Sequence, residues 1–158
     1  MTITLSINGK EKTFGIEPGE KLLDVLRREG YMGVKKGCGS GDCGACAILL
    51  NGRAVNSCLV FAAKADGGEI LTIEGLAAGE TLHPIQTAFL SEGAVQCGYC
   101  TPGMVISTVD LLSRNPDPTE GEIREALSGN LCRCTGYVKQ VRAVQRAAEL
   151  MKDGGADV

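Results

Sequence analysis

Eight cysteines carry the chemistry that this 158-residue sequence suggests most directly. Thiolates bind zinc or iron–sulfur clusters, and four of them complete either a structural zinc site or a [2Fe–2S] cluster. A predicted boundary near residues 75–79 divides the cysteines evenly, so two four-ligand metal sites are the natural interpretation. The first set is Cys38, Cys43, Cys46 and Cys58, and the second is Cys97, Cys100, Cys132 and Cys134.

The first set has the spacing C-x₄-C-x₂-C, and its fourth cysteine follows twelve positions later. This is the plant-type ferredoxin spacing for a [2Fe–2S] cluster. Glycines in the same loop allow it to curl tightly, so that backbone N–H groups can point at the sulfurs. Three of them also match the dinucleotide motif G-x-G-x-x-G, but that motif must follow a strand and open a helix. Here it runs into a predicted strand at Ala47, so the pattern favours iron–sulfur binding. The glycines are Gly37, Gly39, Gly41 and Gly44.

The second set combines Cys97-x-x-Cys100 with Cys132-x-Cys134. A C-x-x-C pair alone is compatible with a redox dithiol or with half of a zinc site. A C-x-C pair is not the common zinc-finger spacing. The second set therefore favours an iron–sulfur cluster but leaves zinc open. Thr101-Pro102 directly follows Cys100 and resembles a helix N-cap with proline at the first position, so the helix N-terminus would face an anionic cluster.

Composition and charge exclude two classes of protein. The formal net charge of −3 and the pI of about 5.2 argue against nucleic-acid binding, which needs a basic face. No apolar run approaches the roughly 20 residues that span a bilayer, and no signal peptide is apparent at the N-terminus. We therefore expect a cytoplasmic protein, a compartment in which disulfides are rare and dense cysteines indicate metal binding or catalysis.

The first half has the patterns of a small α+β domain. Period-2 alternation predicts strands over residues 2–7 and 14–16, joined by an Asn-Gly turn, and further strands over residues 47–50, near 55 and over 70–73. Helical spacing predicts one helix between residues 22 and 30.

The second half is predicted to be helical. Helices are expected around residues 82–89, 101–115, 119–129 and 138–148, and the polar tail from Lys152 is expected to fray. Thr119 and Glu122 form a predicted capping box, and Thr101 is interpreted as a cap. Four short helices suggest a bundle. The single histidine, His83, is interpreted as structural, and Tyr99 and Tyr137 as shields for the second cluster.

Three motifs make the sequence resemble the iron–sulfur (small) subunit of the xanthine oxidase family of molybdenum hydroxylases. They are GCGSGDCGAC (37–46), QCGYCTPGM (96–104) and GNLCRCTGY (129–137), and the likeness covers essentially the whole chain. The resemblance implies an N-terminal β-grasp, plant-type ferredoxin-like domain over residues 1–76. It also implies a C-terminal four-helix bundle domain over residues 77–158, with a [2Fe–2S] cluster in each domain.

The resemblance further implies an electron-transfer subunit with no catalytic residue of its own. The second cluster would face a molybdopterin cofactor on a large subunit, with Gln96 and Cys134 touching the pterin. The first cluster would face an FAD-binding medium subunit or an external acceptor, in a hetero-oligomer that can dimerise. Two alternatives stay open at this point: a free-standing two-cluster ferredoxin-type carrier and a zinc-stabilised interaction module.

Overall fold

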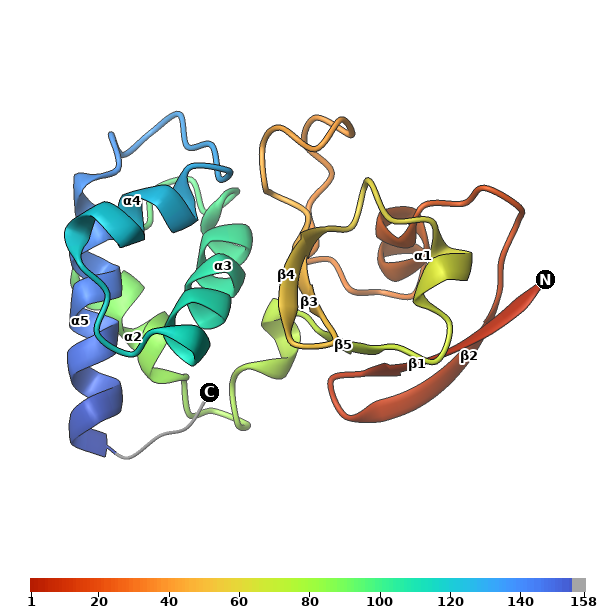
Figure 1. Ribbon diagram of the computed structural model, residues 1–158, viewed down its shortest axis with the longest axis horizontal. Helices are drawn as coiled ribbons and strands as arrows, with labels where there is room; N and C mark the ends of the chain where they lie inside the picture. The colour runs from red at the N-terminus through yellow and green to blue at the C-terminus, as the bar shows by residue number, and fades with distance from the viewer. Residues whose placement is uncertain (155–158) are drawn as a thin grey trace.

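The computed structural model describes residues 1–154, which form a mixed α+β fold (Figure 1). The predicted α+β class is confirmed. Within these residues, one sheet contains the strands β1 (Thr2–Ile7), β2 (Lys10–Gly15), β3 (Ala47–Leu50), β4 (Arg53–Asn56) and β5 (Glu69–Leu71). The α-helices are α1 (Leu22–Arg28), α2 (Pro84–Ser91), α3 (Thr101–Arg114), α4 (Glu120–Leu127) and α5 (Val138–Gly154).

The sheet has the strand order β2-β1-β5-β3-β4. β1 and β5 run parallel, whereas the other neighbouring pairs are antiparallel. Asn-Gly turns close the hairpins β1–β2 and β3–β4, and both residues of each turn have positive φ, as this turn type requires. Helix α1 packs its apolar side against one face of the sheet, in a core that includes Ile3, Leu5, Ile7, Leu22, Leu26, Ile48 and Ile70.

Strand β3 is buried on both faces and thereby connects the two halves of the chain. Ile48 belongs to the core formed with α1, whereas Ala47 and Leu49 join a second core built with helices α2 to α5. Successive side chains of a strand point to opposite faces, so an uninterrupted apolar run suits a strand covered on both sides. Figure 1 shows these four helices gathered on the side of the sheet that carries β3 and β4.

The helical core is made of small and aliphatic side chains around one aromatic residue, Phe89. α2 lies along α5, and α3 contacts α2, α4 and strand β3. None of the helices in residues 1–154 is long and apolar enough to cross a membrane.

Several predicted element boundaries were wrong. The return strand expected over residues 14–16 runs over Lys10–Gly15. The strand expected over residues 70–73 ends at Leu71, because the N–H of Thr72 donates to the Asn8 side chain (2.9 Å) and does not extend the ladder. The helix expected to include Leu82 begins at Pro84. His83 caps it, since the N–H of Ile85 donates to His83 Nδ1 (3.2 Å). The single histidine therefore has the structural role that was predicted.

Two expectations at other helix ends were also wrong. Thr101 does not cap α3: the helix begins at Thr101 itself, Cys100 occupies the N-cap position, and the Thr101 hydroxyl makes no hydrogen bond within residues 1–154. The tail expected to fray from Lys152 is helical through Gly154, and Lys152 pairs with Asp117 at 2.7 Å. The remainder of that tail, residues 155–158, lies outside the described residues.

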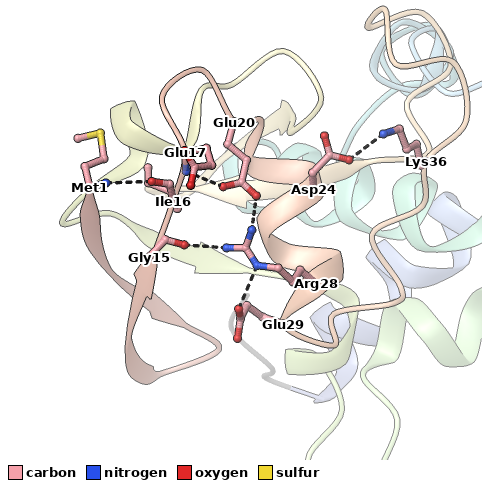
Figure 2. A network of polar contacts seen from close by, with 9 residues as sticks. All are labelled: Met1, Gly15, Ile16, Glu17, Glu20, Asp24, Arg28, Glu29 and Lys36. Carbon is pink, nitrogen blue, oxygen red and sulfur yellow. Dashed lines mark hydrogen bonds and ion pairs between the residues drawn. The ribbon is translucent and has the colours of Figure 1, made fainter.

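Polar contacts hold α1 against the first hairpin and against the loop that follows it (Figure 2). Arg28 pairs with Glu20 and donates a 2.8 Å hydrogen bond to the carbonyl oxygen of Gly15. Asp24 forms a 2.8 Å ion pair with Lys36. An exposed pair of this kind contributes roughly 1 kcal/mol at most. Its position matters more than its strength, because Lys36 lies two residues before Cys38.

Candidate metal centres

The first four cysteines lie on one loop and on the strand end beside it. Cys38, Cys43 and Cys46 belong to the loop between α1 and β3, and Cys58 follows β4. The N–H of Lys35 donates to the Ala45 carbonyl oxygen (3.0 Å) and closes the loop at its base. Cys38 is exposed, Cys43 is half-buried, and Cys46 and Cys58 are buried. One edge of the set therefore faces solvent while the other edge lies in the core.

Backbone N–H groups point at sulfur in this loop, as the glycine pattern predicts. The N–H of Cys38 donates to Cys43 Sγ, and the N–H of Ser40 donates to Cys38 Sγ, both at 3.4 Å. Gly37 is needed for close approach, since a Cβ at this position would lie 2.7 Å from Cys43 Sγ. Such donors stabilise negative charge on thiolate sulfur, which a bound cluster requires.

Two thiols of the first set have pKa values that are shifted in opposite directions before metal binds. Hydrogen bonds from Ser40, and then from Cys43, lower the pKa of Cys38 to about 6. Burial, followed by contact with the Cys46 thiol, raises the pKa of Cys58 to about 11. A buried thiolate without a counter-charge is costly, and a positively charged metal at Cys58 would remove this cost.

The second four cysteines come from two separated segments. Cys97 and Cys100 lie in the turn before α3, and Cys132 and Cys134 lie in the loop between α4 and α5. Cys100 contacts Cys132, and Cys97 contacts Cys134. The N–H of Cys132 donates to the Tyr137 hydroxyl at 2.8 Å. The fold thus brings together the two motif halves that helices α3 and α4 separate along the chain.

Three thiols of the second set also have shifted pKa values before metal binds. Burial, followed by contact with Cys132, raises the pKa of Cys100 to about 12. Burial opposes ionisation of Cys132 too, but hydrogen bonds from the Thr135 hydroxyl and from the backbone of Cys134 and Thr135 hold the pKa of Cys132 below its usual value. The contact with the Cys97 thiol raises the pKa of Cys134.

The arrangement of the thiols in pairs suits a [2Fe–2S] cluster, which places two thiolates on each of its two irons. In the part of the chain that the structure describes, no group of three or more His, Cys, Asp or Glu side chains is arranged around one metal ion. The thiols are in contact in four pairs, two in each set: Cys38 with Cys43, Cys46 with Cys58, Cys97 with Cys134, and Cys100 with Cys132.

The two cysteine loops touch each other directly. The N–H of Leu131 donates to the carbonyl oxygen of Cys43 (2.9 Å), and the buried Asn130 side chain donates to the carbonyl oxygen of Gly44 (3.2 Å). Tyr99 adds a third link, since its hydroxyl donates to the Lys36 carbonyl oxygen at 2.7 Å. Tyr99 is 47% exposed and links the two loops through its hydroxyl. Its expected role as a shield for the second cluster stays a prediction.

Gln96 and Cys134, the residues that the resemblance assigns to a pterin contact, are both exposed at the second set. Sequence reasoning missed Asn130 and Gln140, which are buried beside the cysteines and hydrogen-bonded to them or to their loops. Gln140 did leave a signal, because it is a polar residue on the apolar face that α5 turns to the core. Asn130 left none, since its partner lies 86 residues away.

Comparisons with known proteins agree with two iron–sulfur domains. A family model described as a 2Fe-2S iron-sulfur cluster binding domain matches residues 5–77, and a model described as a [2Fe-2S] binding domain matches residues 72–145. The nicotinate dehydrogenase small FeS subunit of Eubacterium barkeri is 49% identical over 150 residues, which cover 94% of this chain and 96% of that protein.

Two further relatives extend the likeness. The xanthine dehydrogenase iron-sulfur-binding subunit of Escherichia coli O157:H7 is 47% identical over 146 residues, covering 91% of this chain and 92% of that protein. The solved structure of quinoline 2-oxidoreductase from Pseudomonas putida 86 contains a chain with a TM-score of 0.94 and 44% identity, covering 99% of this chain and 98% of that one. The chain therefore belongs to the xanthine oxidase family of molybdenum hydroxylases, as an iron–sulfur small subunit with two [2Fe–2S] clusters.

Proposed function

We propose that this chain relays electrons between a molybdopterin site on a large subunit and a flavin subunit or an external acceptor. The observation that carries the proposal is the contact between the two cysteine loops, in which the Leu131 N–H meets the Cys43 carbonyl oxygen. Each loop supplies ligands to a different cluster, so this contact supports two clusters lying next to each other. A bound [2Fe–2S] cluster supplies one-electron chemistry, and the chain supplies its position and surroundings.

The proposed ligands are the two sets of four cysteines. Support comes from their contact in pairs, from the N–H groups aimed at sulfur and from the pKa values of Cys58 and Cys100, which burial raises. All eight are free thiols, which agrees with a reducing, cytoplasmic location. The first cluster would be held by Cys38, Cys43, Cys46 and Cys58, and the second by Cys97, Cys100, Cys132 and Cys134.

The second site is proposed to face the large subunit. Gln96 and Cys134 are exposed there and can reach a pterin held by a partner. Large apolar side chains on the same helical half are also exposed, and a chain that docks into a complex needs such a surface. They are Leu82, Leu90, Leu131 and Val138. The first site would then face an FAD-binding medium subunit, in a hetero-oligomer that can dimerise.

The proposed domain division is residues 1–76 and 77–158, a β-grasp domain followed by a four-helix bundle. Two separate hydrophobic cores support it, one around α1 and the sheet and one around helices α2 to α5. Ala47 and Leu49 of β3 belong to the helical core, so the two units would share one packed face. A free-standing two-cluster carrier is not favoured, because the relatives are named as subunits.

Affinity purification of the tagged chain from its native host tests the proposal. We expect a large pterin-bearing subunit to co-purify in a fixed ratio. Leu90→Glu places a charge on the exposed apolar surface of the helical half and should reduce recovery of that subunit while leaving iron content unchanged. Met32→Glu, at an exposed apolar residue of the other half, is the matched control. A chain that purifies alone as a stable red-brown monomer would contradict the proposal and favour the free carrier.

A further inference from the structure

A buried glutamine connects the two segments that carry the second set of cysteines. Gln140, near the start of α5, is fully buried, and its Nε2 donates to the carbonyl oxygen of Ala94 at 3.1 Å and to the hydroxyl oxygen of Thr135 at 2.5 Å. The same nitrogen lies 4.0 Å from Cys132 Sγ, a longer contact than the 3.1 Å between Thr135 Oγ1 and that sulfur. Ala94 lies three residues before Cys97, and Thr135 directly follows Cys134. One amide group therefore ties both halves of the site together.

The donors and acceptors around Thr135 fix which atom donates in its contact with Cys132. A hydroxyl has one O–H donor and two lone pairs. Thr135 Oγ1 accepts from Gln140 Nε2 and from the Tyr137 N–H (3.4 Å), which uses both lone pairs. Its hydrogen is left for Cys132 Sγ at 3.1 Å. The orientation of the glutamine amide follows in the same way, since the Ala94 carbonyl can only accept and must face the nitrogen.

Gln140 does not suit the core in which it lies. Its Oε1 is buried and has no hydrogen-bond partner within residues 1–154. An unpaired buried carbonyl oxygen destabilises a fold, so each such group needs an explanation. The neighbouring core positions of α5 are the apolar residues Ala143, Val144 and Ala147. An apolar side chain would suit this face of the helix, but it could not donate to Ala94 and Thr135 as the Gln140 amide does.

We propose that Gln140 and Thr135 are positioning residues that aim one O–H at the Cys132 sulfur and thereby raise the reduction potential of the second cluster. Reduction adds negative charge, part of which resides on the cysteine sulfurs. A donor at sulfur stabilises this charge, and hydrogen bonds to sulfur are among the features that set cluster potentials. The inference rests on the proposed ligand assignment for Cys132.

The test is a potentiometric measurement of both cluster signals by electron paramagnetic resonance, on the complex purified with each variant. Thr135→Val removes the O–H and should make reduction of the second cluster less favourable by roughly tenfold, which is about 59 mV for one electron. Thr135→Ser keeps the O–H and should restore most of the potential. The potential of the first cluster is the internal control and should not change.

Two further variants separate this role from simple packing. Thr108→Val removes a buried hydroxyl that bonds to the Met104 carbonyl oxygen (2.8 Å), away from the cysteines, and should leave both potentials unchanged. Gln140→Met keeps the Thr135 hydroxyl but no longer fixes its orientation. The reduction potential of the second cluster should therefore fall by less than in Thr135→Val. Should Thr135→Val fail to assemble, Gln140→Met supplies the same readout.

The outcomes are distinct. An unchanged potential of the second cluster in Thr135→Val would overturn the proposed roles of Gln140 and Thr135, while the proposed function stands. The same result in Gln140→Met would do so where Thr135→Val does not assemble. A shift of equal size in Thr108→Val would also overturn these roles, because the effect would then reflect packing. If the wild-type chain gives no second cluster signal, the proposed function itself fails.

Discussion

The backbone N–H of Leu131 and the carbonyl oxygen of Cys43 form a 2.9 Å hydrogen bond that joins the two cysteine loops. Cys43 belongs to the first set, and Leu131 immediately precedes Cys132 of the second. The Asn130 side chain reinforces the junction through the Gly44 carbonyl oxygen, 86 residues away in the sequence. The two sites are therefore built as one unit from distant segments, and changes at this junction should affect both.

The close approach of helix α3 to the first loop depends on Gly103. A Cβ at this position would overlap the carbonyl oxygen of Gly44. We expect Gly103→Ala to lower the free energy of unfolding by about 1–3 kcal/mol, as overpacking does, and to reduce iron content at both sites. Chemical denaturation and iron analysis measure the two effects.

Gly121, in α4, is the matched control for that substitution. The nearest atom to a Cβ there is Thr119 Oγ1 at 4.0 Å, so alanine fits without contact strain. Gly121→Ala should raise stability by up to about 1 kcal/mol, because alanine is the better helix former. Equal effects of the two substitutions would mean that α3 and the loop are not tightly packed.

The Asn130 side chain should control the distance between the two sites. Asn130→Ala removes its hydrogen bond to Gly44, which costs about 1 kcal/mol, and should weaken the magnetic coupling between the two reduced clusters. Asn56→Ala removes a comparable bond, from strand β4 to the Gly41 carbonyl oxygen (2.9 Å), which involves the first loop but not the second. It should alter the first cluster signal and leave the coupling in place. Unchanged coupling in Asn130→Ala would show that this contact does not hold the loops together.

The cap of α2 should make stability depend on pH. Burial lowers the pKa of His83 below its usual 6.5, because the neutral ring is favoured, and Nδ1 accepts the Ile85 N–H only when it carries no proton. The unfolded chain then binds the proton more readily than the folded one. The stabilising contribution is complete above pH 6.5 and is lost as the pH falls from there through the lower folded-state pKa.

Asparagine caps a helix without titrating in this range, so His83→Asn is the comparison variant. The difference in urea midpoint between wild type and variant should change between about pH 7.5 and about pH 5.5, in favour of the variant at the acid end. Because both proteins carry the same clusters, acid lability of the metal sites cancels. A difference in urea midpoint that stays constant with pH would show that the His83 cap does not make stability depend on pH.

Local patterns predicted much of the fold, because each depends on neighbouring residues. The Asn-Gly turns and the Thr119 capping box were found where expected, since left-handed turn geometry and N-cap chemistry are properties of a few adjacent residues. The spacing of the first cysteine set is of the same kind.

Features that depend on distant partners could not be predicted. β5 ends early because Thr72 bonds to Asn8, 64 residues away. Asn130 and Gln140 reach partners 86 and 46 residues away, and spacing along the chain contains no information about such pairs. The second cysteine set was ambiguous for the same reason, since its two halves meet only in the folded chain.

The central claim is that the chain holds two separate [2Fe–2S] clusters, one on each set of four cysteines. Iron, zinc and acid-labile sulfide analysis, combined with electron paramagnetic resonance of the reduced protein, tests it most directly in the wild type and in Cys43→Ser and Cys97→Ser. We predict roughly four iron atoms and four sulfides per wild-type chain, with two signals, and loss of a different signal in each variant. Zinc in place of iron, or loss of both signals from either substitution, would contradict the account.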